Sequence, residues 1–231
     1  VLEGLFILLR IRRSMENEKR ALELEKELSQ SRISIMLSQI QPHFLYNSLV
    51  GIKQLCDTDP QRASDALEHF SYYLRGNLDS LSNTGLIPFE KELDHIEDYL
   101  YLEKMRYGER LRIRWEIGYQ DFMLPPLTLQ PIVENAVRYG ITQKKAGGSL
   151  TIRSGQADGS VVITVVDDGV GFDISEKKED GRTHIGLENV RDRLDAMCGG
   201  RLEVKSEIGT GTEIKLILPQ RRNRVNENYS G

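Results

Sequence analysis

Residues 39–49 read QIQPHFLYNSL and place a histidine directly after a proline inside a long helical pattern. Pro42 removes a backbone donor and is expected to disturb the helix just before His43. Asn47 follows four residues after His43, so on a helix the two side chains share a face. A neutral imidazole in this position can act as a nucleophile. The apolar residues of a neighbouring, buried face would be Ile40, Phe44, Leu45 and Leu49.

A lone histidine in an amphipathic helix is more often structural than reactive, so the rest of the chain must decide its role. Lys and Arg number 31 against 35 Asp and Glu, a net charge of −4, whereas nucleic-acid binding requires a basic face. We therefore expect no nucleic-acid partner. Cys56 and Cys198 form no metal-binding or redox motif and are typical of reduced thiols in a cytosolic protein. Without CxxC or HExxH, no zinc site is expected.

The first nine residues, VLEGLFILL, are largely apolar and are followed by Arg10, Arg12 and Arg13. This pattern resembles the cytoplasmic end of a transmembrane helix that begins upstream, although an ordinary buried helix would also produce it. Residues 14–40 contain neither Pro nor Gly. A parallel dimer helix leading into the histidine is predicted there, the alternative being a solvated charged helix. The coiled-coil spacing is carried by Ala21, Leu24, Leu28, Ser31 and Ile35.

Helical periodicity continues beyond the histidine. Residues 57–60, DTDP, predict a helix end, with Asp59 or Ser64 as the N-cap of the next helix. A third helix is predicted over 89–107. Two helices joined by a short turn form a hairpin, and hairpins from two chains would form a four-helix bundle.

From residue 110 the apolar period changes to that of a strand. Residues 111–117 alternate apolar and charged side chains, as a half-buried strand does. The further predicted elements are a helix at 127–139, a hairpin joining 150–152 to 161–166, a polar loop at 173–183, a helix at 186–197, and a second hairpin of 201–206 and 213–218. Helices followed by this mixture predict an α+β fold.

Three short motifs in this half carry chemistry. ENAVRYG, residues 134–140, lies on a helix, where the Asn135 oxygen suits Mg²⁺ and Arg138 can contact phosphate. DDGVG, residues 167–171, follows a strand; its carboxylate can accept the adenine amine, and its glycines let the backbone approach a ligand. HIGLENV, residues 184–190, has a glycine that would open a helix whose N–H groups face phosphate.

Each motif alone has a structural explanation. Asn135 could cap a helix, Asp167 could be a turn residue, and Gly186 could simply start a helix. The stretch 174–182 lies between the second and third motifs, where a lid over a nucleotide would lie. All three motifs, in this order and on these elements, favour a nucleotide site.

Together the motifs resemble the asparagine box and the two glycine boxes of the Bergerat-fold ATP-binding domain shared by histidine kinases, gyrase and MutL. GTGT, residues 209–212, is similar to a further element of that domain. QPHFLYNSL resembles the phosphoacceptor box of LytS/YesM-type sensor histidine kinases, in which an Asn also follows four residues after the His. The resemblance spans residues 34–219.

The resemblance implies a role for each motif residue. His43 would be the phosphoacceptor, Asn135 would coordinate the Mg²⁺ that bridges the ATP phosphates, and Asp167 would bind the adenine amine. Catalysis would consist chiefly of positioning and charge neutralisation. The other nucleotide-binding residues that it implies are Arg138 and Tyr139 on the same wall, Gly169 and Gly171 around the pocket, Gly186 and Leu187 beneath the phosphates, and Thr212 near the nucleotide.

Two positions depart from the pattern of many histidine kinases. Phe44 directly follows the histidine, at the position where many of them carry an Asp or Glu that acts as a base. The identity of any base is therefore open. Asn47 is the second catalytic candidate, as the residue that orients the ring or, in the reverse reaction, a water. The second glycine box has only Gly186 where many kinases have several glycines.

Two other functions are alternatives to a kinase. An ATPase of the gyrase or MutL kind would have a water-activating Glu four residues before Asn135, where this chain has Pro131. A non-catalytic dimeric scaffold would not require an intact Asn135, Asp167 and Gly171. The resemblance therefore favours a two-component sensor histidine kinase that uses ATP and Mg²⁺.

The expected organisation has four parts. Residues 1–33 would form a membrane-proximal segment and coiled-coil signalling helix, and 34–107 the helical dimerisation and histidine phosphotransfer region. Residues 108–220 would form the α/β-sandwich Bergerat-fold catalytic domain, and 221–231 a disordered tail. The implied partners are a second copy in a homodimer, a response regulator, and an upstream transmembrane sensor region of the same chain. The implied location is the cytoplasmic portion of a bacterial membrane protein.

Overall fold

The computed structural model describes residues 13, 15–20, 22–23, 26, 42–82, 85–173 and 182–219, the side chains of 81–82 and 182–185 excepted. The expected membrane-proximal end, most of the coiled coil, the lid and the tail lie outside these residues. None of the described helices is both long and apolar enough to cross a membrane. The chain forms two compact units, Val1–Asn47 and Ser48–Gly231.

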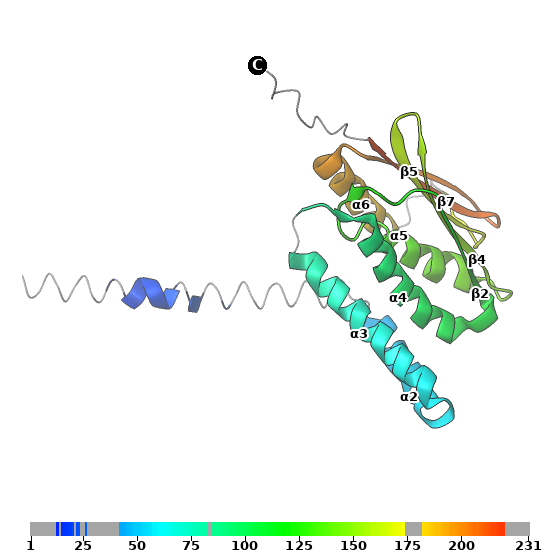
Figure 1. Ribbon diagram of the computed structural model, residues 1–231, viewed down its shortest axis with the longest axis horizontal. Helices are drawn as coiled ribbons and strands as arrows, with labels where there is room; N and C mark the ends of the chain where they lie inside the picture. The colour runs from blue at the N-terminus through cyan, green and yellow to red at the C-terminus, as the bar shows by residue number, and fades with distance from the viewer. Residues whose placement is uncertain are drawn as a thin grey trace, which may run out of the picture. The chain divides into compact units, whose positions relative to one another are not determined.

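Two helices are separated by a single residue, and the first contains nearly all of the phosphoacceptor-like motif. Helix α2 (Pro42–Thr58) and helix α3 (Pro60–Ser82) flank Asp59, where the chain reverses direction (Figure 1). Both begin with a proline, whose missing N–H costs no hydrogen bond in a first turn. The Asp59 Oδ1 accepts a hydrogen bond from the Arg62 backbone N–H at 3.2 Å, so Asp59 is the N-cap, one of the two predicted candidates.

Helix α4 (Phe89–Tyr107) has the predicted bounds and ends in a 3₁₀ turn, η1 (Gly108–Arg110). A two-stranded ribbon of β1 (Ile87–Pro88) and β3 (Met123–Leu124) lies beside its first turn. Alternation could not predict this ribbon, because two residues are too few to show a period.

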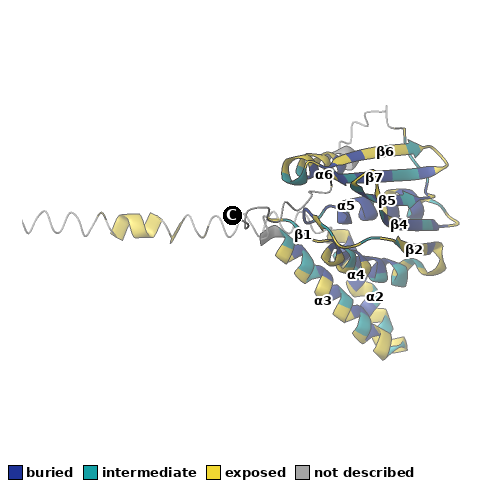
Figure 2. Cartoon of the chain, turned by 45° about the horizontal axis from the view of Figure 1, so that its top comes forward, coloured by how far each residue is buried: buried dark blue, intermediate teal, exposed yellow. Residues whose placement is uncertain are grey.

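A five-stranded mixed sheet forms the other layer, in the order β2-β4-β5-β7-β6 (Figure 2). Only β2 and β4 are parallel. The predicted hairpin is confirmed: β4 and β5 are joined by a turn at Asp158 and Gly159, both with positive φ, as a two-residue type I′ turn requires. The strands are β2 (Leu111–Ile117), β4 (Gly148–Ala157), β5 (Ser160–Asp167), β6 (Arg201–Glu207) and β7 (Gly211–Pro219).

Helices cover one face of this sheet, which confirms the α+β fold (Figures 1 and 2). They are α4, α5 (Gln130–Asn135) and α6 (Arg182–Cys198). The single helix predicted over 127–139 is instead the short α5, a π-helical turn η2 (Ala136–Gly140) and a 3₁₀ turn η3 (Ile141–Gln143). Periodicity does not distinguish these turns from an α-helix, because five and three residues are too few to show a different period.

Gln130, the first residue of α5, is the centre of a buried hydrogen-bond network. Its Oε1 accepts from the His95 Nε2 of α4 at 2.7 Å, which requires the proton of that neutral ring on Nε2. Its Nε2 donates to the Glu134 Oε1 at 2.7 Å and to the Asn77 Oδ1 of α3 at 3.2 Å. The Tyr73 hydroxyl also donates to Glu134, at 3.4 Å. The network therefore joins α3, α4 and α5 within the core.

Replacing Gln130 with Leu tests this network. The change keeps a side chain of similar size but leaves several buried polar groups without their partner, and we expect a loss of about 2–4 kcal/mol in the free energy of unfolding. Urea denaturation measures it. The control is Gln61→Leu on α3, an exposed site where the change should be within about 0.5 kcal/mol. Equal losses in both variants would contradict a special role for the network.

Candidate functional site

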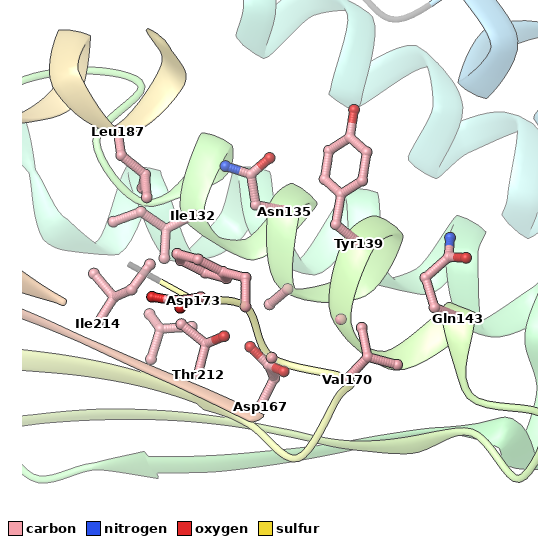
Figure 3. A pocket seen from close by; sticks show the side chains of 15 residues that line it. Ile132, Asn135, Tyr139, Gln143, Asp167, Val170, Asp173, Leu187, Thr212 and Ile214 are labelled. Carbon is pink, nitrogen blue, oxygen red and sulfur yellow. The ribbon is translucent and has the colours of Figure 1, made fainter. Parts of the chain in front are cut away.

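A cavity of about 440 Å³ lies between α5, η2 and the sheet, with α6 at one end (Figure 3). Asn135 and Tyr139 extend from the helical side, and Asp167 and Thr212 from the sheet side. The structure thus brings together six of the predicted binding residues, since Gly171 and Leu187 also line the cavity. Its apolar lining consists of Ile132, Ala136, Val165, Val170, Phe172 and Ile214.

Asp167 is the last residue of β5, and its side chain is the buried acid of this cavity, with the residue 5% exposed. Its Oδ1 accepts a hydrogen bond from the Gly169 backbone N–H at 2.8 Å. Burial raises the pKa of Asp167 to about 6, and the charge of Asp168 adds to the rise. The N–H groups of Gly169 and Thr212 oppose it, as does Lys144. At neutral pH the carboxylate is mainly ionised and accepts hydrogen bonds only.

Two glycines allow the helical side and the sheet side to touch. A β-carbon on Gly169 would lie 2.3 Å from the carbonyl carbon of Gly140, and one on Gly140 would lie 2.6 Å from the Asp167 Oδ1. The Val170 N–H donates to the Gly140 carbonyl at 3.2 Å, which fixes this contact. Gly140 ends the quoted motif ENAVRYG, but its role depends on a contact between distant segments, so sequence reasoning did not single it out.

The turn after Asp167 is anchored to the β6–β7 hairpin. Gly171 has φ +61°, and a β-carbon there would lie 2.0 Å from the Glu207 carbonyl oxygen. The Phe172 N–H donates to the Ser206 Oγ at 2.9 Å, and Ser206 Oγ lies 3.0 Å from the Thr212 Oγ1. Gly171 therefore serves a close backbone approach, and the hairpin carries Thr212 to the cavity wall.

The π-helical turn η2 directly follows Asn135. The Ile141 N–H reaches back to the carbonyls of Ala136 and Val137, which widens the turn; such turns are frequent at functional sites. Arg138 is exposed and does not line the cavity, and its guanidinium lies over the Tyr139 ring at 4.9 Å from the centroid. Arg138 as a ligand-binding residue stays a prediction.

Helix α6 begins at Arg182, one turn before the predicted start at Gly186. The expectation that Gly186 opens this helix is wrong, because residues 182–185 contain no helix breaker and extend it. Gly186 nevertheless lies close to Asn135: a β-carbon on it would be 3.9 Å from the Asn135 Nδ2. Its role toward a ligand stays a prediction.

Sequence reasoning missed several lining residues. Gln143 lies four residues after Tyr139, and Ile132 three before Asn135, so helical spacing from the motif could have found both. Asp173 follows the glycine motif by two residues and carries no comparable signal.

His43 lies on α2 in the first compact unit and is exposed. The Asn47 Nδ2 lies 3.0 Å from its Nδ1 and 3.2 Å from its Nε2, so the predicted shared face is confirmed. Phe44 is buried, but Leu45 is half-buried and Leu49 is 51% exposed. The expectation that Leu49 is buried is therefore wrong for a single chain.

Comparison with known proteins identifies the family to which the chain belongs. One family model, histidine kinase, matches residues 31–111; another, histidine kinase-, DNA gyrase B- and HSP90-like ATPase, matches 126–222. YwpD of Bacillus subtilis (strain 168) is 35% identical over 199 residues, which cover 83% of this chain and 71% of YwpD. The chain belongs to the histidine kinase family. Its ATPase-type region implies that this kinase chain uses ATP.

Longer sensor kinases are also similar to this kinase chain. The sensor protein LytS of Bacillus anthracis is 32% identical over 212 residues, which cover 86% of this chain but only 36% of LytS. The chain thus spans little more than a third of such a relative. The histidine kinase domain of a blue-light activated kinase from Erythrobacter litoralis EL346 is 15% identical, covers 82% of this chain and 91% of its own, and has a TM-score of 0.46. At that level of similarity nothing further follows from it.

The contact between Gly140 and Gly169 can be tested by Gly169→Ala. The added β-carbon must push the loop away from the helix, and we expect a loss of about 1–3 kcal/mol in the free energy of unfolding. The matched control is Gly155→Ala in β4, where a β-carbon would meet nothing within 4 Å and φ is negative or extended. Thermal unfolding of both variants measures the difference. Equal stabilities would show that the loop yields without cost.

Proposed function

We propose that this chain is the kinase portion of a two-component sensor. It binds Mg–ATP in the cavity, transfers the γ-phosphoryl group to His43, and passes that group to an aspartate of a response regulator. The observation that carries this proposal is the buried, ionised Asp167 in an apolar cavity, on the same chain as an exposed histidine with an amide partner. The chain would function as a homodimer and form the cytoplasmic portion of a bacterial membrane protein.

Asp167 would select adenine. Its carboxylate accepts a hydrogen bond from the exocyclic amine, whereas guanine presents a carbonyl acceptor at the same ring position and would be repelled. Val165 and Ile214 of the sheet and Leu187 of α6 supply apolar surface against the ring. A few polar groups in an otherwise apolar pocket are typical of a specific small-molecule site.

Asn135 would hold Mg²⁺ together with the ATP phosphates. No cluster of three or more His, Cys, Asp or Glu in the described part of the chain could hold a metal ion. The phosphates and water would supply the other ligands, as is usual for Mg²⁺ in nucleotide sites. Gly169 and Gly171 allow the close approach of the loop to Gly140 and Glu207, which would hold it beside the nucleotide, and Gly186 leaves room beside the Asn135 side chain.

A neutral His43 can attack without a preceding deprotonation. A ring nitrogen forms a bond to the γ-phosphorus while the bond to the ADP oxygen breaks, and the other ring nitrogen then releases its proton to solvent. An Asp or Glu acting as a base at position 44 is therefore not required for the attack. Asn47 would act as a positioning residue: amide oxygen and nitrogen are interchangeable by a flip, and the Oδ1 in that place would accept a hydrogen bond from the ring nitrogen that carries the proton.

The helical region offers an apolar surface for a second copy. Leu49 on α2 and Leu67 and Leu78 on α3 are 51%, 51% and 46% exposed. The interface of a helical bundle consists of such apolar side chains. A homodimer through these helices accounts for their exposure.

The gyrase-like ATPase alternative has less support. Its water-activating acid would have to face the cavity, but Pro131 occupies the expected position. The neighbouring Glu134 is buried, accepts hydrogen bonds from Gln130 and Tyr73, and does not line the cavity.

Incubation with γ-labelled ATP and Mg²⁺ tests the phosphoryl transfer. Wild type should acquire an acid-labile, base-stable label, and His43→Ala should lose it while still binding nucleotide. His69→Ala, which removes a histidine of α3, is the control and should keep the label. Phosphate release without protein label would favour an ATPase, and bound ATP without any turnover would favour a scaffold; either result would contradict the proposal.

Asp167→Asn tests the adenine contact. The amide replaces the acceptor oxygen with a donor on one side, so we expect ATP affinity to fall about 10- to 100-fold, as for a charge-assisted hydrogen bond. Asp158→Asn is the control, because its hairpin turn tolerates Asn and lies in the β4–β5 loop. Unchanged ATP affinity in Asp167→Asn would refute the assignment.

The same variant should stabilise the ligand-free fold. Burial raises the pKa of Asp167 from 3.8 to about 6. The free-energy cost of burying the ionised carboxylate is therefore absent below pH 3.8, grows as the pH rises, and is complete above pH 6. Removing the charge should therefore stabilise by up to about 3 kcal/mol at neutral pH. The gain should vanish as the pH falls below about 4. Unfolding of both proteins at pH 7.5 and pH 3.5 measures it.

A further inference from the structure

Glu92 of α4 accepts three backbone hydrogen bonds from one short segment. Its carboxylate oxygens lie 2.5 Å from the Leu127 nitrogen, 3.1 Å from that of Thr128 and 2.9 Å from that of Leu129. The residue is only 2% exposed. These N–H groups immediately precede α5, so Glu92 holds the entry to the helix that carries Asn135.

A second helix holds the same segment from the other side. The Arg193 guanidinium of α6 donates to the Leu127 carbonyl at 2.7 Å. Leu127 has φ +56°, which is rare for a residue with a branched side chain and persists only where its surroundings fix it. One peptide unit is thus gripped by α4 through its N–H and by α6 through its carbonyl.

Glu92 and Arg193, which hold residues 127–129 between them as a clasp, carry opposite charges. Burial raises the pKa of Glu92, while the three N–H groups and the charge of Arg193 counter the rise. Burial lowers the pKa of Arg193, and the charge of Glu92 opposes that. Each group therefore stabilises the charged form of the other in a largely dry environment.

The clasp connects two walls of the cavity. α5 contributes Ile132 and Asn135 to the lining, and α6 contributes Leu187, whereas Asp167 and Thr212 belong to the sheet. We propose that Glu92 is a positioning residue for Mg²⁺ and phosphate: it fixes Asn135 through the start of α5 and, with Arg193, fixes α6 opposite it. This inference rests on the proposed function. The adenine end of the site, held by the sheet, should not depend on Glu92.

The test is Glu92→Gln, with Glu90→Gln as the matched control, an exposed glutamate in the same first turn of α4. Calorimetry is carried out with two ligands, Mg–ADP and adenosine. We expect Glu92→Gln to weaken Mg–ADP binding at least about tenfold, because one amide cannot accept all three N–H bonds, and to change adenosine binding less than about twofold. The control should change neither. A purely structural role would reduce both affinities together, in proportion to the unfolded fraction.

Arg193→Met supplies a second variant if Glu92→Gln does not fold. It removes the hydrogen bond to the Leu127 carbonyl and should likewise weaken Mg–ADP binding while leaving adenosine binding nearly unchanged. The control is Arg191→Met, at an exposed site of the same helix. Wild-type affinities for both ligands in folded Glu92→Gln or Arg193→Met would overturn the inference while leaving the proposed function intact. A wild-type protein that binds neither ligand would instead overturn the proposed function.

Discussion

The cavity depends on a helix that could not exist alone. α5 has six residues, far fewer than an isolated helix needs in water. Its geometry comes from what surrounds its first turn: the Glu92 carboxylate on the preceding N–H groups, and the Gln130 amide in the network with His95 and Glu134. These buried polar contacts are directional, so they fix the rotation of α5 about its axis as apolar packing alone would not. The direction of Asn135 follows from that rotation.

Two buried carboxylates show how the chain separates structure from binding. Glu92 has its oxygens occupied by three backbone donors of its own chain, and it does not line the cavity. Asp167 receives backbone donors from Gly169 and Thr212 but faces the cavity, where acceptor capacity remains for a ligand. Both have a raised pKa for the same reason, burial. What distinguishes them is the direction of the remaining lone pairs.

Much of the fold could be predicted because its signals are local. The bounds of α4, the Asp59 cap and the Asp158–Gly159 turn depend on neighbouring residues, and the sequence motifs identified six of the fifteen residues that line the cavity. The misses depend on tertiary contacts. The widened turn η2, the early start of α6 and the exposure of Leu49 have no local signature. Glu92 was missed for the same reason: its partners lie 35 to 37 residues away along the chain.

The anchoring of the loop by the last hairpin has a consequence for biosynthesis. Gly211 and Thr212 of β7 lie against Asp167, and a β-carbon on Gly211 would be 2.0 Å from the Asp167 carbonyl oxygen. Asn135, Asp167 and the elements between them, η2, η3, β4 and β5, leave the ribosome first, but the cavity lacks the wall that carries Thr212 and Ile214 until β7 is added. A chain stalled during translation before that strand would therefore carry every quoted motif except GTGT and still have an incomplete cavity.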